Sequence, residues 1–95
     1  MNEPAIVSYG HQFFGNYSVK EYRDSLVRAF VDKRADFILL DDNPRGQKFL
    51  AAVVAWAMDE GLLYNDRNED DNDTRQVVSY FRLTAKGEKE IMGQP

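Results

Sequence analysis

The chain has 95 residues, of which 43% are hydrophobic and 13% aromatic, so its apolar side chains suffice for one core, and residues 1–95 are expected to form a single domain. It has no cysteine, which excludes disulfide scaffolding and thiolate chemistry, and it has neither an export signal nor an apolar stretch of membrane-spanning length, so a cytoplasmic protein is expected. Twelve basic against sixteen acidic residues give a net charge of -4, the opposite of what a protein that mainly binds phosphates carries.

The first predicted element is an extended N-terminal segment over residues 1–17. Between Ala5 and Phe14 it is rich in β-branched and aromatic residues but contains Gly10, which favours an extended chain or a short strand. Aromatic side chains of this kind either cover a neighbouring helix or lie at an interface, and we expect the first for this set: Tyr9, Phe13, Phe14 and Tyr17.

A first helix is predicted to begin after Ser18. Glu21 follows Ser18 by three residues and completes a capping box, in which a hydroxyl and a carboxylate each accept an amide N–H at the start of the helix. Tyr17, just before the cap, is placed to pack on Tyr22. Apolar residues then recur at spacings of three and four, which predicts an amphipathic helix through about Arg34.

The next stretch predicts a short element and then a second helix. Phe37 to Leu40 is an apolar run that suits a brief buried strand or a helical turn. Asn43-Pro44 marks a boundary, because proline disfavours a helical residue before it and starts a helix well. The second helix is predicted from about Pro44 to Glu60 and ends at Gly61, the residue type that takes a left-handed conformation after a C-terminus.

The last third of the chain predicts a hairpin and a short helix. Leu62–Asn65 and Gln76–Leu83 have the composition and alternation of strands, with a polar loop between them. Thr84 is a suitable N-cap for a helix over Ala85–Met92, after which residues 93–95 are expected to fray. The prediction is therefore a small α+β domain with three helices and a β-hairpin.

One motif resembles a known family. A helix, a glycine and two strands around a polar tip are followed by Leu83-Thr84, Lys86-Gly87 and Ile91, and this order resembles the second half of a winged-helix (winged helix-turn-helix) domain. The resemblance covers residues 45–92. It implies a winged-helix-like core over residues 18–92, in which the hairpin is the wing and the helix before it is the recognition helix.

A DNA-binding transcriptional regulator is the alternative function that this resemblance implies, with contacts from the N-terminal end of the recognition helix: Arg45, Gln47 and Lys48. The rest of that helix fits poorly. If Phe49, Leu50, Val53, Trp56 and Ala57 face the core, the exposed face is mostly alanine, which cannot distinguish base edges: Lys48, Ala51, Ala52, Ala55 and Asp59.

The predicted wing is acidic. Five carboxylates outnumber Arg67 and Arg75 there, and they would repel a phosphate backbone: Asp66, Glu69, Asp70, Asp71 and Asp73. We therefore expect these residues to form the binding surface for a protein partner, such as a basic or nucleic-acid-binding protein, that is attracted by charge. The plain alternative is a solvated tip that discourages edge pairing.

The apolar second helix supplies the other candidate surface. Residues 49–58 carry no charge, and a helix that is apolar nearly all round is either central in its domain or covered by a second chain. Trp56 and Met58 are candidate interface residues for a partner or for a homodimer, with ordinary core packing as the alternative for Trp56. The expected role is a non-enzymatic adaptor or inhibitor, by analogy a phage-borne inhibitor of a nucleic-acid-binding host complex.

No enzyme or cofactor pattern is present, so we expect no catalytic residue, cofactor or metal site. His11 is the only histidine, and no glycine-rich phosphate loop or nucleophile motif occurs. Alternating oxygen ligands resemble a calcium loop at Asp66, Asn68, Asp70 and Asn72. However, Asp71 stands where such a loop requires glycine, and Val77 stands where it requires glutamate.

Overall fold

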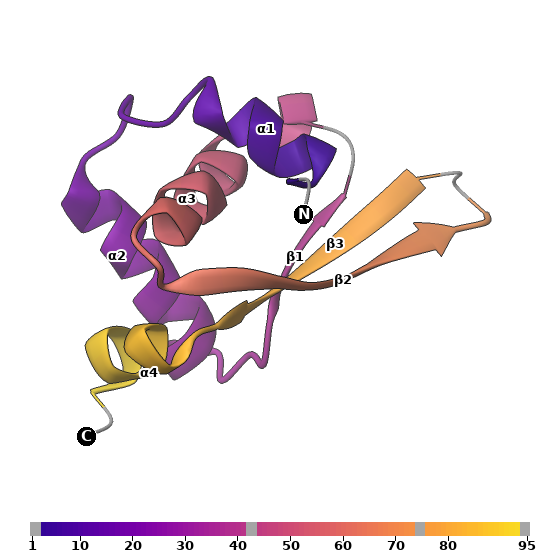
Figure 1. Cartoon of the computed structure of the whole chain (residues 1–95). Coiled ribbons are helices and arrows are strands. Elements are labelled where there is room, and N and C mark those ends of the chain that lie inside the picture. The colour runs from indigo at the N-terminus through magenta and orange to yellow at the C-terminus, as the bar shows by residue number, and fades with distance from the viewer. Residues whose placement is uncertain (1–2, 42–43, 74–75, 94–95) are drawn as a thin grey trace.

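The structure, a computed structural model, describes residues 3–41, 44–73 and 76–93. In these residues the chain is an α+β domain, and Figure 1 shows the helices gathered on one side with the β2–β3 hairpin reaching away from them. The elements in chain order are α1 Ala5–His11, α2 Val19–Val27, the π-helix η1 Arg28–Asp32, β1 Ile38–Asp41, the 3-10 helix η2 Pro44–Gln47, α3 Lys48–Asp59, β2 Leu63–Asp71, β3 Gln76–Leu83 and α4 Ala85–Met92.

The α+β class agrees with the sequence prediction, and the detail differs. The described residues form four α-helices rather than three, and β1 adds a third strand to the hairpin. This arrangement is not an exact match to the three helices and hairpin wing that the winged-helix resemblance implies. None of the helices in the described ranges is both long and apolar enough to span a bilayer.

The sheet is antiparallel with the strand order β1-β3-β2, so β3 is central and the other two strands are edges. β1 pairs with β3 from Ile38 opposite Phe81 to Asp41 opposite Val78, and beyond Val78 the described hairpin is two-stranded. Alternate residues such as Ser79 and Phe81 are buried toward the helices. Their neighbours therefore point to the other side of the sheet, called the outer face below.

The core is built around α3. All seven residues from Ala51 to Ala57 are buried, with exposed fractions of 5% or less. On one side, Tyr22 of α2 stacks on Trp56 with ring centroids 5.4 Å apart. On another side lies α1, where a Cβ added to Gly10 would meet the Ala51 carbonyl oxygen at 2.1 Å. From Ala51 to Ala57 the apolar helix is thus enclosed by its own chain.

The prediction of an extended N-terminal segment is wrong, because residues 5–11 form the helix α1. Ile6, Val7 and Gly10 are its buried residues, and their spacing of three and four places them on one helical face. β-branched composition favours a strand only weakly, and packing against α3 outweighs it. Pro4 precedes the first turn, where a missing N–H costs nothing.

The predicted start of the next helix is confirmed. The Ser18 hydroxyl accepts a hydrogen bond from the Glu21 N–H at 3.1 Å, and Tyr17 meets Tyr22 edge to face at 6.1 Å between ring centroids. The helix continues from α2 into η1 and ends at Asp32, and Arg34 just beyond it has a left-handed φ of 53°. A glycine would be the usual residue at such a position.

The motif that carries the winged-helix resemblance joins α4 to the end of α3. Thr84 caps α4 by accepting from the Gly87 N–H at 3.0 Å, and its own hydroxyl donates to the Gly61 carbonyl. Lys86 Nζ donates to the Glu60 carbonyl at 2.7 Å. A Cβ on Gly87 would lie 2.1 Å from the Leu62 carbonyl oxygen, so only glycine permits this contact.

The polar loop predicted after Asn65 is wrong over most of its length. β2 continues to Asp71, so four of the five acidic residues belong to a nine-residue strand, and Asp73 lies in the turn that follows it. Aspartate and asparagine have low strand propensity. Pairing with β3 outweighs this propensity, because it gives the β2 backbone a neighbouring strand to pair with. A register shift between Asn65 and Arg67 marks an irregularity at the point where the polar part begins.

Candidate functional site

A network of ion pairs and aromatic rings covers the outer face at the middle of the hairpin. Arg67 donates to Glu69 at 2.9 Å and to Asp66 at 2.8 Å. Its guanidinium carbon lies 4.0 Å from the centroid of the Tyr80 ring, and Phe37 meets the same ring edge to face at 5.0 Å. These contacts fix the strand residues from which the acidic tip extends.

The Glu69 carboxylate is held by two side chains of this network. It accepts hydrogen bonds from Arg67 and from the Tyr80 hydroxyl, the latter at 2.9 Å. Both bonds favour the ionised form and lower the pKa of Glu69, and the bond from Arg67 has the larger effect. The same bond to Glu69 raises the pKa of Tyr80. Glu69 therefore stays negative at neutral pH, and the positive charge of Arg67 balances part of its negative charge.

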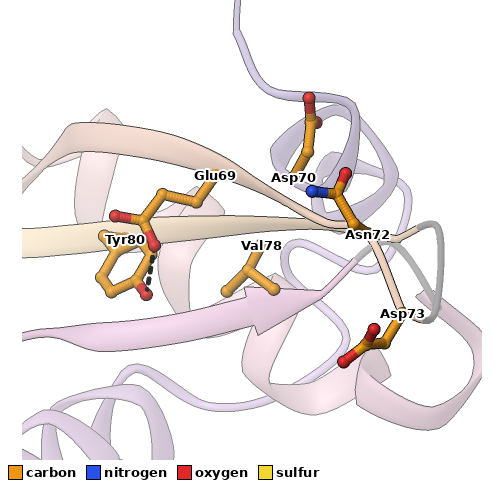
Figure 2. A pocket seen from close by; sticks show the side chains of 6 residues that line it. All are labelled: Glu69, Asp70, Asn72, Asp73, Val78 and Tyr80. Carbon is orange, nitrogen blue, oxygen red and sulfur yellow. Dashed lines mark hydrogen bonds between the residues drawn. The ribbon is translucent and has the colours of Figure 1, made fainter.

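Figure 2 shows the end of the hairpin, where six side chains surround an open hollow of about 450 Å³: Glu69, Asp70, Asn72, Asp73, Val78 and Tyr80. Glu69 leans onto Tyr80, whereas the Asp70 and Asp73 carboxylates point away from each other. Asp70 and Asp73 are both exposed. The hollow is therefore lined by negative groups that diverge toward solvent.

The five predicted partner-binding acids fall into three groups. Asp66 and Glu69 lie against Arg67, and Asp66 also lies 3.4 Å from Arg82 Nε. Asp70 and Asp73 are exposed at the tip. Asp71 ends β2, and its side chain lies outside the described part of the structure. The structure therefore brings the acids onto one hairpin but leaves two of them partly neutralised.

The same placement bears on the calcium pattern. Asp66 and Asp70 belong to an extended strand, so their carboxylates do not wrap around one point as loop ligands do. In the part of the chain that the structure describes, no three histidine, cysteine, aspartate or glutamate side chains gather in a way that would hold a metal ion.

Trp56 and Met58 were the candidate interface residues on the apolar helix. Trp56 lies in the core, where it is 5% exposed and stacked on Tyr22. Met58 is partly buried and packs against the same core. Trp56 is thus covered by its own chain, and Met58 is covered only in part.

The predicted exposed face of α3 is wrong at its three alanines, whereas Lys48 and Asp59 are exposed as expected. Ala51, Ala52 and Ala55 have no exposed surface, and α1 packs on Ala51 and Ala55 through Gly10. Phe49, expected in the core, is 37% exposed. These three alanines therefore present no surface to a DNA groove.

The three residues named for DNA contact lie before or at the first turn of α3. Gln47 Oε1 accepts the Asp41 N–H at 3.1 Å. Lys48 is exposed, with its Nζ 5.6 Å from the centroid of the Phe13 ring. The side chain of Arg45 lies outside the described residues. Gln47 thus holds the end of β1, and Lys48 is exposed beside the Phe13 ring.

Sequence reasoning missed the Arg67, Tyr80 and Phe37 cluster. These residues come from two strands and the segment before β1, and only the cross-strand register, with Arg67 opposite Tyr80, brings them together. Finding this cluster from the sequence would have required the prediction that β2 runs to Asp71. The acidic composition of residues 66–71 indicated a loop instead. His11, the lone histidine, lies 3.2 Å from Glu3 at the surface.

Comparison with known proteins gives no match, whether to a protein-family model, to a curated protein or to a solved structure.

Proposed function

We propose that this protein is a non-enzymatic protein-binding module, acting as an adaptor or inhibitor, that engages a basic partner with the acidic end of its β2–β3 hairpin. The observation that carries the proposal is the exposure of Asp70 and Asp73 at the end of a hairpin that projects from the helical body (Figure 1). Between Leu63 and Leu83 the sequence has five acidic and three basic residues. A projecting acidic surface attracts a basic partner and speeds its association.

The internal ion pairs support this role. Arg67 pairs with Asp66 and Glu69 at the middle of the hairpin. Farther along the sequence, Asp70, Asp71 and Asp73 outnumber Arg75. The middle of α3 is buried and offers no surface to a partner. The hairpin, in contrast, reaches farthest from the body of the molecule in Figure 1. A partner can therefore approach it without displacing the core.

The experiment compares three forms of the full chain as bait in cells of its source. Asp70→Asn with Asp73→Asn removes two tip charges, and Asp59→Asn with Glu60→Gln removes two exposed charges at the end of α3. We expect wild type and the α3 variant to retain the same salt-sensitive protein, and the tip variant to retain about tenfold less, since each lost charge weakens steering and contact. Equal retention by all three forms contradicts the proposal.

A second measurement addresses DNA. Binding of random-sequence duplex is measured at low and at physiological salt, with Lys48→Ala as the test variant. A phosphate-binding protein loses affinity steeply with salt, and one removed lysine lowers that slope. We expect no binding at physiological salt. Tight, salt-sensitive binding that Lys48→Ala weakens would support the DNA-binding regulator instead.

A further inference from the structure

The outer side of β2 is an open strand edge. In the order β1-β3-β2, β2 pairs with β3 on one side, and none of the strands in the described ranges lies on its other side. Figure 1 shows the distal half of β2 projecting with no helix beside it. An unpaired edge presents backbone N–H and C=O groups in a row, which another extended chain can use.

The direction of those groups follows from the register. The Asn65 side chain donates to the Tyr80 carbonyl at 3.2 Å, so this carbonyl points toward β2. Directions alternate along a strand, so Tyr80 and Val78 bond to their partners Arg67 and Glu69. Asn68 and Asp70 then direct their backbone groups away from β3, onto the open edge.

The edge of β1 is different. β1 has four residues, and the Asp41 N–H, which alternation directs away from β3, is taken by Gln47 Oε1 at 3.1 Å. Only Leu39 offers its backbone groups between that cap and the start of the strand. A side chain thus closes the shorter edge, while the longer edge of β2 has no such cap among the described residues.

The side chains of β2 select what can pair with that edge. Glu69 lies on the outer face, and Asp70, opposite Val77, lies on the other face. Two β2 edges from two copies would place carboxylates against carboxylates, which disfavours self-pairing. A strand with Lys or Arg at successive positions meets acids on both faces.

We propose, as an extension of the function above, that an extended polybasic segment of the partner adds to β2 as a fourth strand of the sheet along Asn68–Asp70. Backbone hydrogen bonds to Asn68 and Asp70 set its position, and its cationic side chains face Glu69 and Asp70. The hairpin therefore recognises an extended basic arm rather than a folded basic surface.

The probe is an acetylated and amidated ten-residue peptide of Lys, Arg and Val, together with the same peptide N-methylated at alternate residues. N-methylation removes the N–H groups of one edge and keeps every charge. Loss of two backbone bonds is expected to weaken binding about tenfold or more, measured by calorimetry at constant salt. Equal affinity of the two peptides overturns the strand-addition proposal and leaves attraction by charge intact.

Two variants test the protein side. Asn68→Pro removes an N–H that points to the open edge, and such positions accept proline. Val77→Pro is the control, because this residue alternates with Val78 and directs its N–H away from β2. We expect about tenfold weaker peptide binding for Asn68→Pro and wild-type binding for Val77→Pro.

The failures of the two proposals are distinguishable. Wild-type affinity of Asn68→Pro for the peptide contradicts strand addition alone. Wild-type affinity of Asp70→Asn with Asp73→Asn contradicts the acidic hairpin as a binding surface. If Asn68→Pro lowers the thermal stability more than Val77→Pro does, the comparison of the two peptides with the wild-type chain decides.

Discussion

The α3 helix and the β2–β3 hairpin are the two stretches of most uneven composition, one apolar and the other acidic, and they lie in opposite surroundings. Every α3 residue from Ala51 to Ala57 is buried, whereas β2 is exposed from Asp66 to Asp70. The apolar stretch finds its cover inside the chain, in α1 and α2. The acidic stretch has no such cover in the described residues. An unusual composition indicates an outside partner only where the chain's own elements leave it open.

The largest effect is expected where α1 meets α3. Gly10→Ala places a methyl group 2.1 Å from the Ala51 carbonyl oxygen, so the two helices must separate or α1 must detach. We expect a loss of about 3 kcal/mol in the free energy of unfolding, measured by urea titration, as for other overpacked contacts. Ser8→Ala, an exposed change in the same helix, is the control and is expected to have no effect beyond about 0.5 kcal/mol.

If Gly10→Ala unfolds at wild-type urea concentration, α1 is not needed to cover α3, and the contrast between the two regions fails. If instead the variant is destabilised and begins to self-associate, detachment of α1 has exposed the apolar face of α3 that α1 covers in the wild type.

The second effect concerns the other end of α3. Thr84→Val keeps the shape of the side chain and removes the hydroxyl that caps α4 and donates to the Gly61 carbonyl. Loss of a cap and a further hydrogen bond is expected to cost about 1 to 2 kcal/mol in thermal unfolding. Thr84→Ser restores the hydroxyl and should recover most of the stability. Equal stability of the Val and Ser variants would show that α4 docks by apolar contact alone.

Features that depend on near neighbours in sequence were predictable. The capping side chains Ser18 and Thr84 act within three residues, and Gly61 has the left-handed φ of 75° that its place after a helix predicts. Such signals carry their physical cause with them. They locate three helix boundaries without knowledge of the rest of the fold.

Features that depend on distant partners were not predictable. Ile6 and Val7 favour a strand by composition and form a helix because α3 is available to pack against. β2 extends through unfavourable residues because β3 lies beside it. The acids of the candidate site were identified from composition, but the pairing of Arg67 with Tyr80 needed the cross-strand register.

A smaller effect of opposite sign is expected at Arg34, which lies between η1 and β1. Its φ of 53° is left-handed, a conformation in which a Cβ is strained. Arg34→Gly is expected to raise the free energy of unfolding by about 0.5 to 1 kcal/mol, because glycine takes this conformation without strain. Arg34→Ala removes the same side chain and keeps the Cβ, so it should remain at wild-type stability. A stabilised alanine variant would mean that the arginine side chain, not its backbone, is unfavourable.

The smallest effect is expected in the hairpin. Tyr80→Phe removes the hydroxyl that donates to Glu69 and keeps the ring beneath Arg67. The pKa of Glu69 should rise toward its ordinary value but stay below it, since the Arg67 hydrogen bond is the larger cause of its lowered pKa. Carboxyl NMR titration of both proteins measures this shift, and an unchanged pKa would show that the hydroxyl does not hold Glu69.

The pH dependence of stability follows from the direction of that shift. A carboxyl whose pKa is lowered on folding stabilises the fold above its unfolded pKa, and the contribution is lost as the pH falls through the folded value. Wild type should therefore exceed Tyr80→Phe slightly at neutral pH, and the two should converge in acid, where Glu69 is protonated. Because this carboxylate is exposed, the difference should be far smaller than that at Gly10. A larger difference would mean that the hairpin, like α3, holds part of the fold together.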